Sequence, residues 1–435
     1  TYAWTVPNVP TTQALVRVTA HDVNGNIGSD ASDATFTIAY PPVGAITNLV
    51  ATQVRTGNLP DSTTGVILSW AGTPAGTVVE VWRHGFGYYP EYDDAGGAVP
   101  TASATYPPGA GWTLTSVTAP DGEDLASVRD FYYFVAFVKD GYGTWSTASN
   151  VTTGTLNYHL GDVSNGVHAG TGNNRVSDAD ISLLGSHYGI TLGAGDPLGY
   201  LDVGPTTDMW VDGRPTTDNR VQFEDLVIFG LNYASVSKAD PHPAAAMIDA
   251  LVLDVPAVVQ AGDLVEARVQ MRGTGLVFGL SVAVTWDPAM VTPISVVAGD
   301  LAAANGVVVL TPEPGVVDAM VLGTAGGGIT GYGDLAVFQF RALADGAPGI
   351  TGDSVTARAG HNLAVVVPFT TTTAASDTPP PAMTQLAPAQ PNPFSRTSTI
   401  SFSLAEAGTV DLGLYAASGA RVRTLARGPH EPGVY

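Results

Sequence analysis

The residues best suited to chemistry stand in a segment that occurs twice in this chain. Residues 173–188 read NNRVSDADISLLGSHY and residues 218–233 read DNRVQFEDLVIFGLNY, and the two align without a gap at an offset of 45 residues. Each copy supplies polar side chains, then an Asp, then an apolar run typical of a helix. A calcium loop needs oxygen ligands at set spacings and a late carboxylate from the start of a helix. The repeat therefore predicts two calcium loops.

The candidate ligands follow the same order in both copies. They are a side-chain oxygen, a backbone carbonyl, a direct or water-mediated ligand and a closing carboxylate: Asn173, Arg175, Ser177 and Asp180 in the first copy, and Asp218, Arg220, Gln222 and Asp225 in the second. An Asp at a helix start is also a common N-cap, so two capped helices without metal are the alternative. Duplication at a fixed spacing favours Ca²⁺ as the bound cofactor.

The repeated unit resembles a type I dockerin domain, a pair of calcium loops that close with Asp. The resemblance implies that each loop also opens with an Asp, which assigns Asp162 in LGDVSNG and Asp202 in YLDVGPT. The chain departs from the family here, because 11 and 16 residues separate these Asp residues from Asn173 and Asp218, where the family has four. The insertions add four further candidates for the remaining ligands: Ser164, Asn165, Asp208 and Asp212.

The composition predicts the elements that must hold these loops. The chain has 435 residues with 51 Gly and 31 Pro, few charged residues, and long tracts of Val, Thr, Ala and Ser. Such a chain forms many short strands joined by turns, and its length suggests three or four domains. We expect a mainly all-β protein of tandem immunoglobulin-like and cohesin-like β-sandwiches, with one small α-helical dockerin-like calcium module at residues 160–235.

Two further regions precede this module. In residues 1–40, apolar side chains alternate with polar ones at Val16, Val18 and Ala20, and the region resembles the last hairpin of an immunoglobulin-like sandwich. Forty residues cannot bury a sandwich core alone, so the missing strands must come from upstream or from another chain. The first residue is Thr, which suggests processing or an upstream segment. Residues 45–155 carry GVILSW, TVVEVWRH and FYYFVAFVKDGYGTWSTASN, an order that resembles a fibronectin type III domain with a long insertion at 85–128.

Three regions follow the module and its linker at 239–246. Residues 248–372 contain VPAVVQAGDLVEARVQM, VFGLSVAVTWDPAMV and GDLAVFQFRA, and they resemble a cohesin domain. Residues 376–390 read as a Pro-rich linker. Residues 391–435 resemble the C-terminal sorting or anchoring module of surface proteins exported by type IX secretion, with about half of the expected strands.

Charge and motifs exclude several functions. The formal net charge of −22 disfavours nucleic acid and anionic membranes, no apolar run reaches the ~18 residues of a membrane span, and Cys is absent. No H-E-x-x-H or G-x-S-x-G motif occurs, so we expect no enzyme activity. The aromatic residues of GFGYYPEYDD at 85–94 suggest stacking on sugar rings, or a packed insertion or domain contact as the more ordinary interpretation.

These features together predict a secreted, extracellular or cell-surface structural protein of a bacterium, stabilised by calcium and able to form filaments. The expected partners are other copies of the chain, joined head to tail through cohesin-like and dockerin-like surfaces and through strand completion, or other surface proteins; polysaccharide is a further candidate. Two neighbouring modules can instead pack together within one chain. The alternative functions are the accessory C-terminal region of a large secreted hydrolase and a carbohydrate-binding adhesin.

Overall fold

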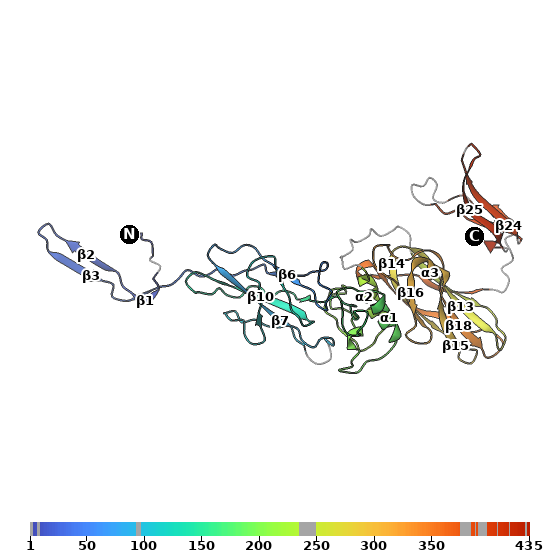
Figure 1. Cartoon of the computed structure of the whole chain (residues 1–435), viewed down its shortest axis with the longest axis horizontal. Coiled ribbons are helices and arrows are strands. Elements are labelled where there is room, and N and C mark those ends of the chain that lie inside the picture. The colour runs from blue at the N-terminus through green and yellow to red at the C-terminus, as the bar shows by residue number, and fades with distance from the viewer. Residues whose placement is uncertain are drawn as a thin grey trace.

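The computed structural model describes residues 3–6, 9–92, 97–234, 249–374, 384–387, 389, 398–406, 408–416, 418–430 and 433–435. The predicted linker at 239–246, and the linker at 376–390 apart from 384–387 and 389, lie outside these residues. The fold is mainly β, as the composition predicts. Figure 1 shows the parts following one another along the long axis, from a narrow ribbon through a sandwich and a helical segment to a larger sandwich.

The first part, here called the N-terminal ribbon (residues 11–38), consists of two antiparallel strand pairs. Strand β1 (Thr11–Ala14) pairs with β4 (Phe36–Ile38), and β2 (Arg17–His21) pairs with β3 (Ile27–Ala31). The carboxylate of Asp22 accepts the backbone N–H groups of Asn24 and Asn26 at 2.8 Å each, which fixes the turn between β2 and β3. Val18 is 62% exposed, so the ribbon buries little of its apolar face.

The second part, the middle sandwich (residues 46–158), has two antiparallel sheets. One contains β5 (Val50–Gln53), β6 (Val66–Ser69) and β9 (Gly122–Asp124), and the other contains β7 (Val78–Gly85), β8 (Thr113–Leu114), β10 (Phe131–Lys139) and β11 (Thr155–Leu156). Strand β10 is buried on both faces. Phe134 and Val138 join the core between the sheets, while Phe131, Tyr133 and Phe137 join a second core under the inserted segment.

The third part, the loop–helix module (residues 159–234), contains the repeated segment. Its elements are α1 (Asp178–Ser186), the short 3-10 helix η1 (Gly199–Leu201) and α2 (Phe223–Asn232). Leu184 of α1, and Leu226 and Phe229 of α2, are fully buried. These residues share one core with the second core of the middle sandwich, so the module is a continuation of that sandwich.

The fourth part, the large sandwich (residues 249–374), packs two five-stranded sheets face to face. The first sheet has the order β15 (Val291–Ala298), β18 (Thr330–Ala342), β13 (Leu264–Thr274), β12 (Ala250–Pro256), β21 (Phe369–Ala374). The second has the order β16 (Val307–Leu310), β17 (Val316–Val321), β14 (Val277–Thr285), β19 (Thr351–Ala359), β20 (Ala364–Val365). The alternating residues Val265, Ala267, Val269 and Met271 all enter the core, as their period predicts. Helix α3 (Asp300–Asn305) and the 3-10 helix η2 (Gly360–Asn362) connect strands.

The last part contains short strands. Strands β22 (Gln385–Leu386), β23 (Phe402–Leu404) and β26 (Gly433–Val434) form one sheet, and β24 (Gly408–Tyr415) pairs with β25 (Arg421–His430) in a ribbon. Leu414 and Val422 of this ribbon are 46% and 64% exposed.

Candidate functional site

The closing carboxylates of the two repeats make the same hydrogen bonds. Asp180 Oδ1 accepts the N–H groups of Val163 and Ser164 at 2.8 Å each, and Asp225 Oδ1 accepts those of Val203 and Gly204 at 2.7 and 2.9 Å. The second oxygen of each Asp accepts the N–H of its helix N-cap residue, at 2.8 Å for Ser177 and 2.9 Å for Gln222. Each carboxylate thus ties the start of its helix to the start of its loop.

The opening carboxylates span the inserted residues. Asp162 accepts the N–H groups of Asn173 and Asn174 at 2.8 and 2.9 Å, and Asp202 Oδ2 accepts that of Asn219 at 2.7 Å. Asn174 and Asn219 are equivalent in the repeat, and both have a positive φ, 62° and 65°. Asn tolerates this left-handed conformation better than most residues, which lets the chain turn back at the same point in both copies.

The other predicted ligands lie around these four carboxylates. Asn173 Oδ1 is buried and accepts no hydrogen bond within the described residues, and the side chains of Arg175 and Arg220 are exposed. The hydroxyl of Ser177 donates to Asp180 Oδ2 at 3.0 Å. Asp218 accepts the N–H of Arg220 at 3.0 Å and the side-chain amide of Gln222 at 3.1 Å.

The residues of the insertions are engaged close to their own positions. Asn165 Oδ1 accepts the N–H groups of Val167 and His168 at 2.9 and 2.8 Å, and Asp208 Oδ1 accepts that of Trp210 at 3.0 Å. Asp212 forms an ion pair with Arg55 of the middle sandwich. These side chains shape the inserted turns.

The donor set of the first loop does not fit a calcium ion. Asp180 already accepts four hydrogen bonds, and two carboxylate oxygens offer about four lone-pair sites. Asp162 Oδ2 accepts a guanidinium N–H of Arg129 at 2.9 Å in addition to that of Asn174. In the second loop Asp225 Oδ2 accepts the single N–H of Gln222, which leaves capacity for a cation. Across the part of the chain that the structure describes, no three His, Asp or Glu side chains converge as a metal site.

Burial dominates the electrostatics of both loops. It raises the pKa of the Asp162 carboxyl to about 6 although the charge of Arg129 acts in the opposite direction. It also raises the pKa of Asp180 against four hydrogen bonds that favour the charged form. The pKa of Asp225 is raised well above its ordinary value by burial and by the nearby charge of Asp202. The second loop therefore holds two buried carboxylates that repel each other.

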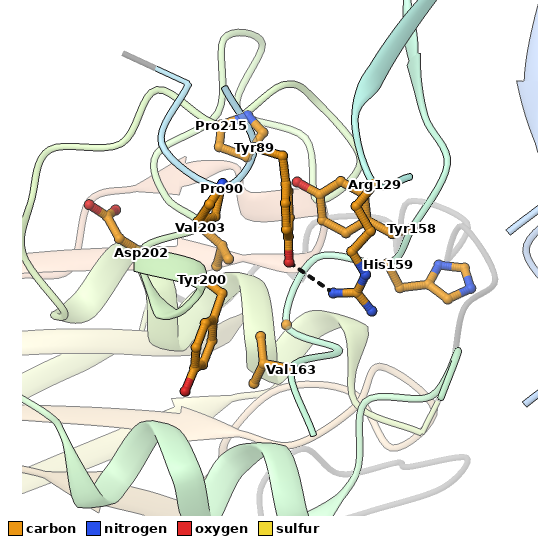
Figure 2. Close-up of a pocket in the computed structure, with 11 residues that line it drawn as sticks. Tyr89, Pro90, Arg129, Tyr158, His159, Val163, Tyr200, Asp202, Val203 and Pro215 are labelled. Atoms are coloured by element: carbon orange, nitrogen blue, oxygen red, sulfur yellow. Dashed lines mark hydrogen bonds between the residues drawn. The ribbon is translucent and has the colours of Figure 1, made fainter. Parts of the chain in front are cut away.

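The junction between the module and the middle sandwich is built around Arg129. Figure 2 shows this side chain beside Tyr89 and Tyr158, with its guanidinium donating to the Tyr89 hydroxyl at 3.4 Å. The adjoining cavity has a volume of about 10 Å³, room for one water molecule. Burial and the charges of Arg55 and Arg129 lower the pKa of the neighbouring His159 to about 3. Such a small space does not admit a substrate.

The opposite side of the module covers the second sheet of the large sandwich. Helix α2 packs on β14 and β17, and a Cβ on Gly230 would lie 2.5 Å from Met320 Cγ. Gly323 donates its N–H to the carbonyl of Gly230 at 2.8 Å, and the Tyr188 hydroxyl donates to Asp318 Oδ2 at 2.7 Å. Met320 and Phe278 of the large sandwich belong to the core of the module. The loop–helix module and the large sandwich therefore form one packed unit within the chain.

Sequence reasoning missed the residues that join the parts. Three residues far away in the sequence contact the module: Arg129, Asp318 and Met320. The alternation of residues in or beside their strands does not indicate these contacts. For the aromatic cluster at 86–92 the sequence suggests either a sugar site or a packed insertion or domain contact. Phe86 and Tyr92 are 8% and 2% exposed and lie in the core shared with the module, whereas Tyr88 is 55% exposed.

Comparison with known proteins identifies one region. Residues 250–377 match the family model of the cohesin domain, so the large sandwich is a cohesin-like domain, as its sequence predicts. The comparison with curated proteins gives no match. None of the helices in the described ranges is long and apolar enough to span a membrane.

Several solved cohesin structures are similar to a part of this chain. The sixth cohesin of scaffoldin B from Acetivibrio cellulolyticus, in complex with a dockerin mutant, is 18% identical over 28% of this chain and 99% of its own, with a TM-score of 0.23. A type II cohesin from the cellulosome of the same organism is 12% identical over 29% and 92%, with a TM-score of 0.24. A non-cellulosomal cohesin from Archaeoglobus fulgidus is 14% identical over 29% and 93%, with a TM-score of 0.22.

Proposed function

We propose that this chain is a non-catalytic scaffolding protein of a bacterial cell surface or extracellular filament. The cohesin-like domain supports a connecting role, because this class of domain binds other proteins. The excess of 39 acidic over 17 basic residues suits a solvated surface that does not bind polyanions.

One observation carries the proposal: the loop–helix module lies against the β14–β17 face of the cohesin-like domain in the same chain. We interpret the module as a dockerin-like partner held in cis. Holding it there keeps the apolar side chains of Met320 and Phe278 from solvent and joins the middle and large sandwiches into one stiff connector. A stiff connector is what a surface filament or spacer needs.

Head-to-tail assembly would then proceed by exchange of this contact. The module of one copy would leave its own large sandwich and bind that of the next copy, which makes a heterologous contact that closes into a ring or extends as a filament. The cis contact competes with exchange because a short connection gives a high effective concentration. Assembly should therefore require high protein concentration or conditions that open the cis contact.

The N-terminal ribbon offers the second route of assembly, completion by strands of another copy. Val16 and Val18 are 55% and 62% exposed on one face of the ribbon. The paired strands β2 and β3 leave edges to which a further strand can add. We propose a second copy of this chain as the occupant, since the C-terminal ribbon of β24 and β25 exposes apolar side chains of its own.

Calcium is proposed at the second loop, with Asp202, Asp218 and Asp225 as the acidic ligands. The structure does not bring these three carboxylates together as a metal site, so binding would require them to move toward one another. A divalent cation there would relieve the repulsion between Asp202 and Asp225, which together with burial raises the pKa of Asp225. The carbonyl of Arg220 and the side chain of Gln222 complete the proposed set. Binding would add stability in proportion to the logarithm of the calcium concentration.

Polysaccharide binding has weaker support. Of the aromatic cluster only Tyr88 is largely exposed, and a sugar-stacking surface normally presents more than one accessible ring. An accessory region of a secreted hydrolase would use the same connecting geometry. This alternative changes the domains to which the chain is joined and leaves its connecting role the same.

Light scattering after size exclusion tests the proposal on the intact chain. We expect a monomer when fresh dilute protein is run, and a slowly growing population of higher mass after incubation at high concentration. A monomer at every concentration and incubation time would contradict assembly. Turnover of casein or of common polysaccharides that a single Asp or Glu substitution abolishes would contradict the non-catalytic role.

A further inference from the structure

Arg129 reaches from the middle sandwich into the first loop of the module. It stands just before β10, so the strand fixes where its side chain begins. Its Nη2 donates to Asp162 Oδ2 at 2.9 Å and its Nη1 donates to the carbonyl oxygen of Asp162 at 2.7 Å. A carboxylate oxygen and a backbone carbonyl oxygen are the two kinds of ligand that a calcium loop offers to its ion.

The Arg129 guanidinium has further partners in the middle sandwich. Its Nε donates to the carbonyl of Ser62 at 2.6 Å, and its carbon lies 5.0 Å from the centroid of the Tyr158 ring. The side chains of Arg129 and Asp162 are 6% and 0% exposed. A buried carboxylate is stable in its charged form only with a partner of opposite charge. Arg129 supplies that charge to Asp162.

The inserted segment closes the space above this ion pair. A Cβ on Gly172 would lie 1.9 Å from Arg129 Nη2 and 2.1 Å from Asp162 Oδ2, so only a residue without a side chain fits there. The closing Asp180 already accepts four hydrogen bonds. A calcium ion with six to eight ligands has no room in this arrangement.

We propose that Arg129 takes the place of a divalent cation in the first loop. The first repeat then closes without metal, and it closes only when the middle sandwich is folded and presents Arg129. Any calcium dependence of the chain resides outside the first loop. Loss of the Arg129 charge leaves Asp162 as a buried carboxylate that a cation can compensate.

Thermal unfolding of four full-length proteins tests this, each in chelator and in millimolar calcium. They are the wild type, Arg129→Leu, Arg129→Leu with Asp162→Asn, and Arg83→Leu. We expect Arg129→Leu to melt on the order of 10 °C lower in chelator and to recover part of the loss in calcium. Adding Asp162→Asn should restore stability in chelator and remove the extra response to calcium.

Arg83→Leu is the matched control. Arg83 Nη1 donates to the Asp124 carboxylate at 2.8 Å in the same sandwich, and the Asp124 side chain is 3% exposed. Its loss should lower the melting temperature without a response to calcium beyond that of the wild type. An Arg129→Leu protein whose response to calcium equals that of the wild type would overturn the proposal.

A second measurement decides the question if Arg129→Leu fails to fold. Equilibrium dialysis measures the calcium bound to the wild type, to Asp225→Asn and to Asp225→Asn with Asp162→Asn. Asp225→Asn, which alters the second loop, should bind no tightly held calcium. Calcium that remains on Asp225→Asn and disappears when Asp162→Asn is added would place an ion in the first loop and overturn the proposal. The absence of such an ion supports it, whether or not the second loop binds calcium.

Discussion

At the scale of single residues, the carboxylates of the repeat act first as binders of backbone N–H groups. Asp180 and Asp225 hold loop and helix together through hydrogen bonds that are nearly identical in length. A buried donor left without an acceptor costs about 1–3 kcal/mol. These residues therefore stabilise the module whether or not a metal is bound, and an Asp at each helix start serves as cap and loop closure at once.

Asp180→Ala removes the acceptor of the N–H groups of Val163, Ser164 and Ser177. We expect a loss of about 3 kcal/mol or more in the free energy of unfolding, of the same size in chelator and in calcium. Asp178→Ala is the control, because Asp178 is exposed on the same helix and accepts from the Tyr233 hydroxyl; its loss should be about 1 kcal/mol or less. Urea unfolding measures both. A loss that calcium reverses would contradict this view of Asp180.

Asp318 should make stability depend on pH. It is 1% exposed, and burial raises the pKa of its carboxyl to about 6 although the hydrogen bond from the Tyr188 hydroxyl favours the charged form. A raised carboxyl pKa means that the folded state binds a proton more tightly than the unfolded state. The stability from this proton is full below the ordinary pKa of 3.8 and is lost as the pH rises through about 6.

The variant Asp318→Asn isolates this contribution. Asn keeps a hydrogen-bond acceptor for Tyr188 and does not ionise. We expect the variant to be more stable than the wild type at about pH 7.5, with a difference that shrinks as the pH falls to about 4.5. Denaturant unfolding across this range gives the comparison. A difference that stays constant with pH would exclude Asp318 as the titrating group.

At the scale of elements, the two helices of the repeat meet the large sandwich through equivalent glycines. Gly185 of α1 and Gly230 of α2 occupy the same position in the two copies. A Cβ on Gly185 would lie 3.7 Å from Leu310, an ordinary contact, whereas a Cβ on Gly230 would lie 2.5 Å from Met320 Cγ. The two helices share a sequence pattern, but only α2 is packed closely enough to need its glycine.

Substitution of the two glycines should have opposite effects. Gly230→Ala should destabilise the contact of α2 with the large sandwich by about 1–3 kcal/mol, because the added methyl group overpacks Met320. Gly185→Ala should be neutral or stabilise by up to about 1 kcal/mol, since Ala is the better helix former. Calorimetry of both full-length variants measures the shifts. Equal shifts in the two variants would show that α2 is not packed as described.

The sequence predicts local features better than contacts between parts. The repeat predicts helices that begin at Asp180 and Asp225, and the structure begins them two residues earlier, at Asp178 and Phe223. The alternation of apolar residues from Val265 to Met271 gives the buried face of β13. The partner of Asp162 could not be predicted, because Arg129 precedes a strand of another domain and resembles any exposed Arg. Nor does periodicity reveal Ser146, Ser149 and Thr152, whose hydroxyls accept N–H groups of β10 along a segment outside any strand.

At the scale of the whole molecule, apolar cores follow one another and overlap at the junctions. One core lies between the sheets of the middle sandwich, and another lies between those of the large sandwich. The core between them includes Phe137, Leu226 and Met320, one from each of the three parts. A shared core of this kind should make the middle sandwich, module and large sandwich unfold together. The N-terminal ribbon lies outside these cores (Figure 1).

The ribbon should govern association through strand completion. Val18→Lys places a charge on the face that carries Val16 and Ala20, and we expect it to reduce the mass observed at high concentration. Thr19→Lys adds the same charge to the opposite face of β2 and should leave association unchanged. Sedimentation velocity compares the two variants at matched concentrations. Equal association of both proteins would show that this face of the ribbon is not the surface through which copies associate.

The central claim is that the loop–helix module covers the cohesin-like domain within one chain. The chain has no Cys, so Ser186→Cys on α1 and Thr311→Cys after β16 provide two exposed spin-label sites without background. These sites flank the contacts of Gly185 with Leu310 and of Gly189 with Pro312. Double electron–electron resonance should give one short, narrow distance that persists in an excess of unlabelled protein. A broad, long distribution, or a short distance that dilution with unlabelled protein removes, would contradict the claim.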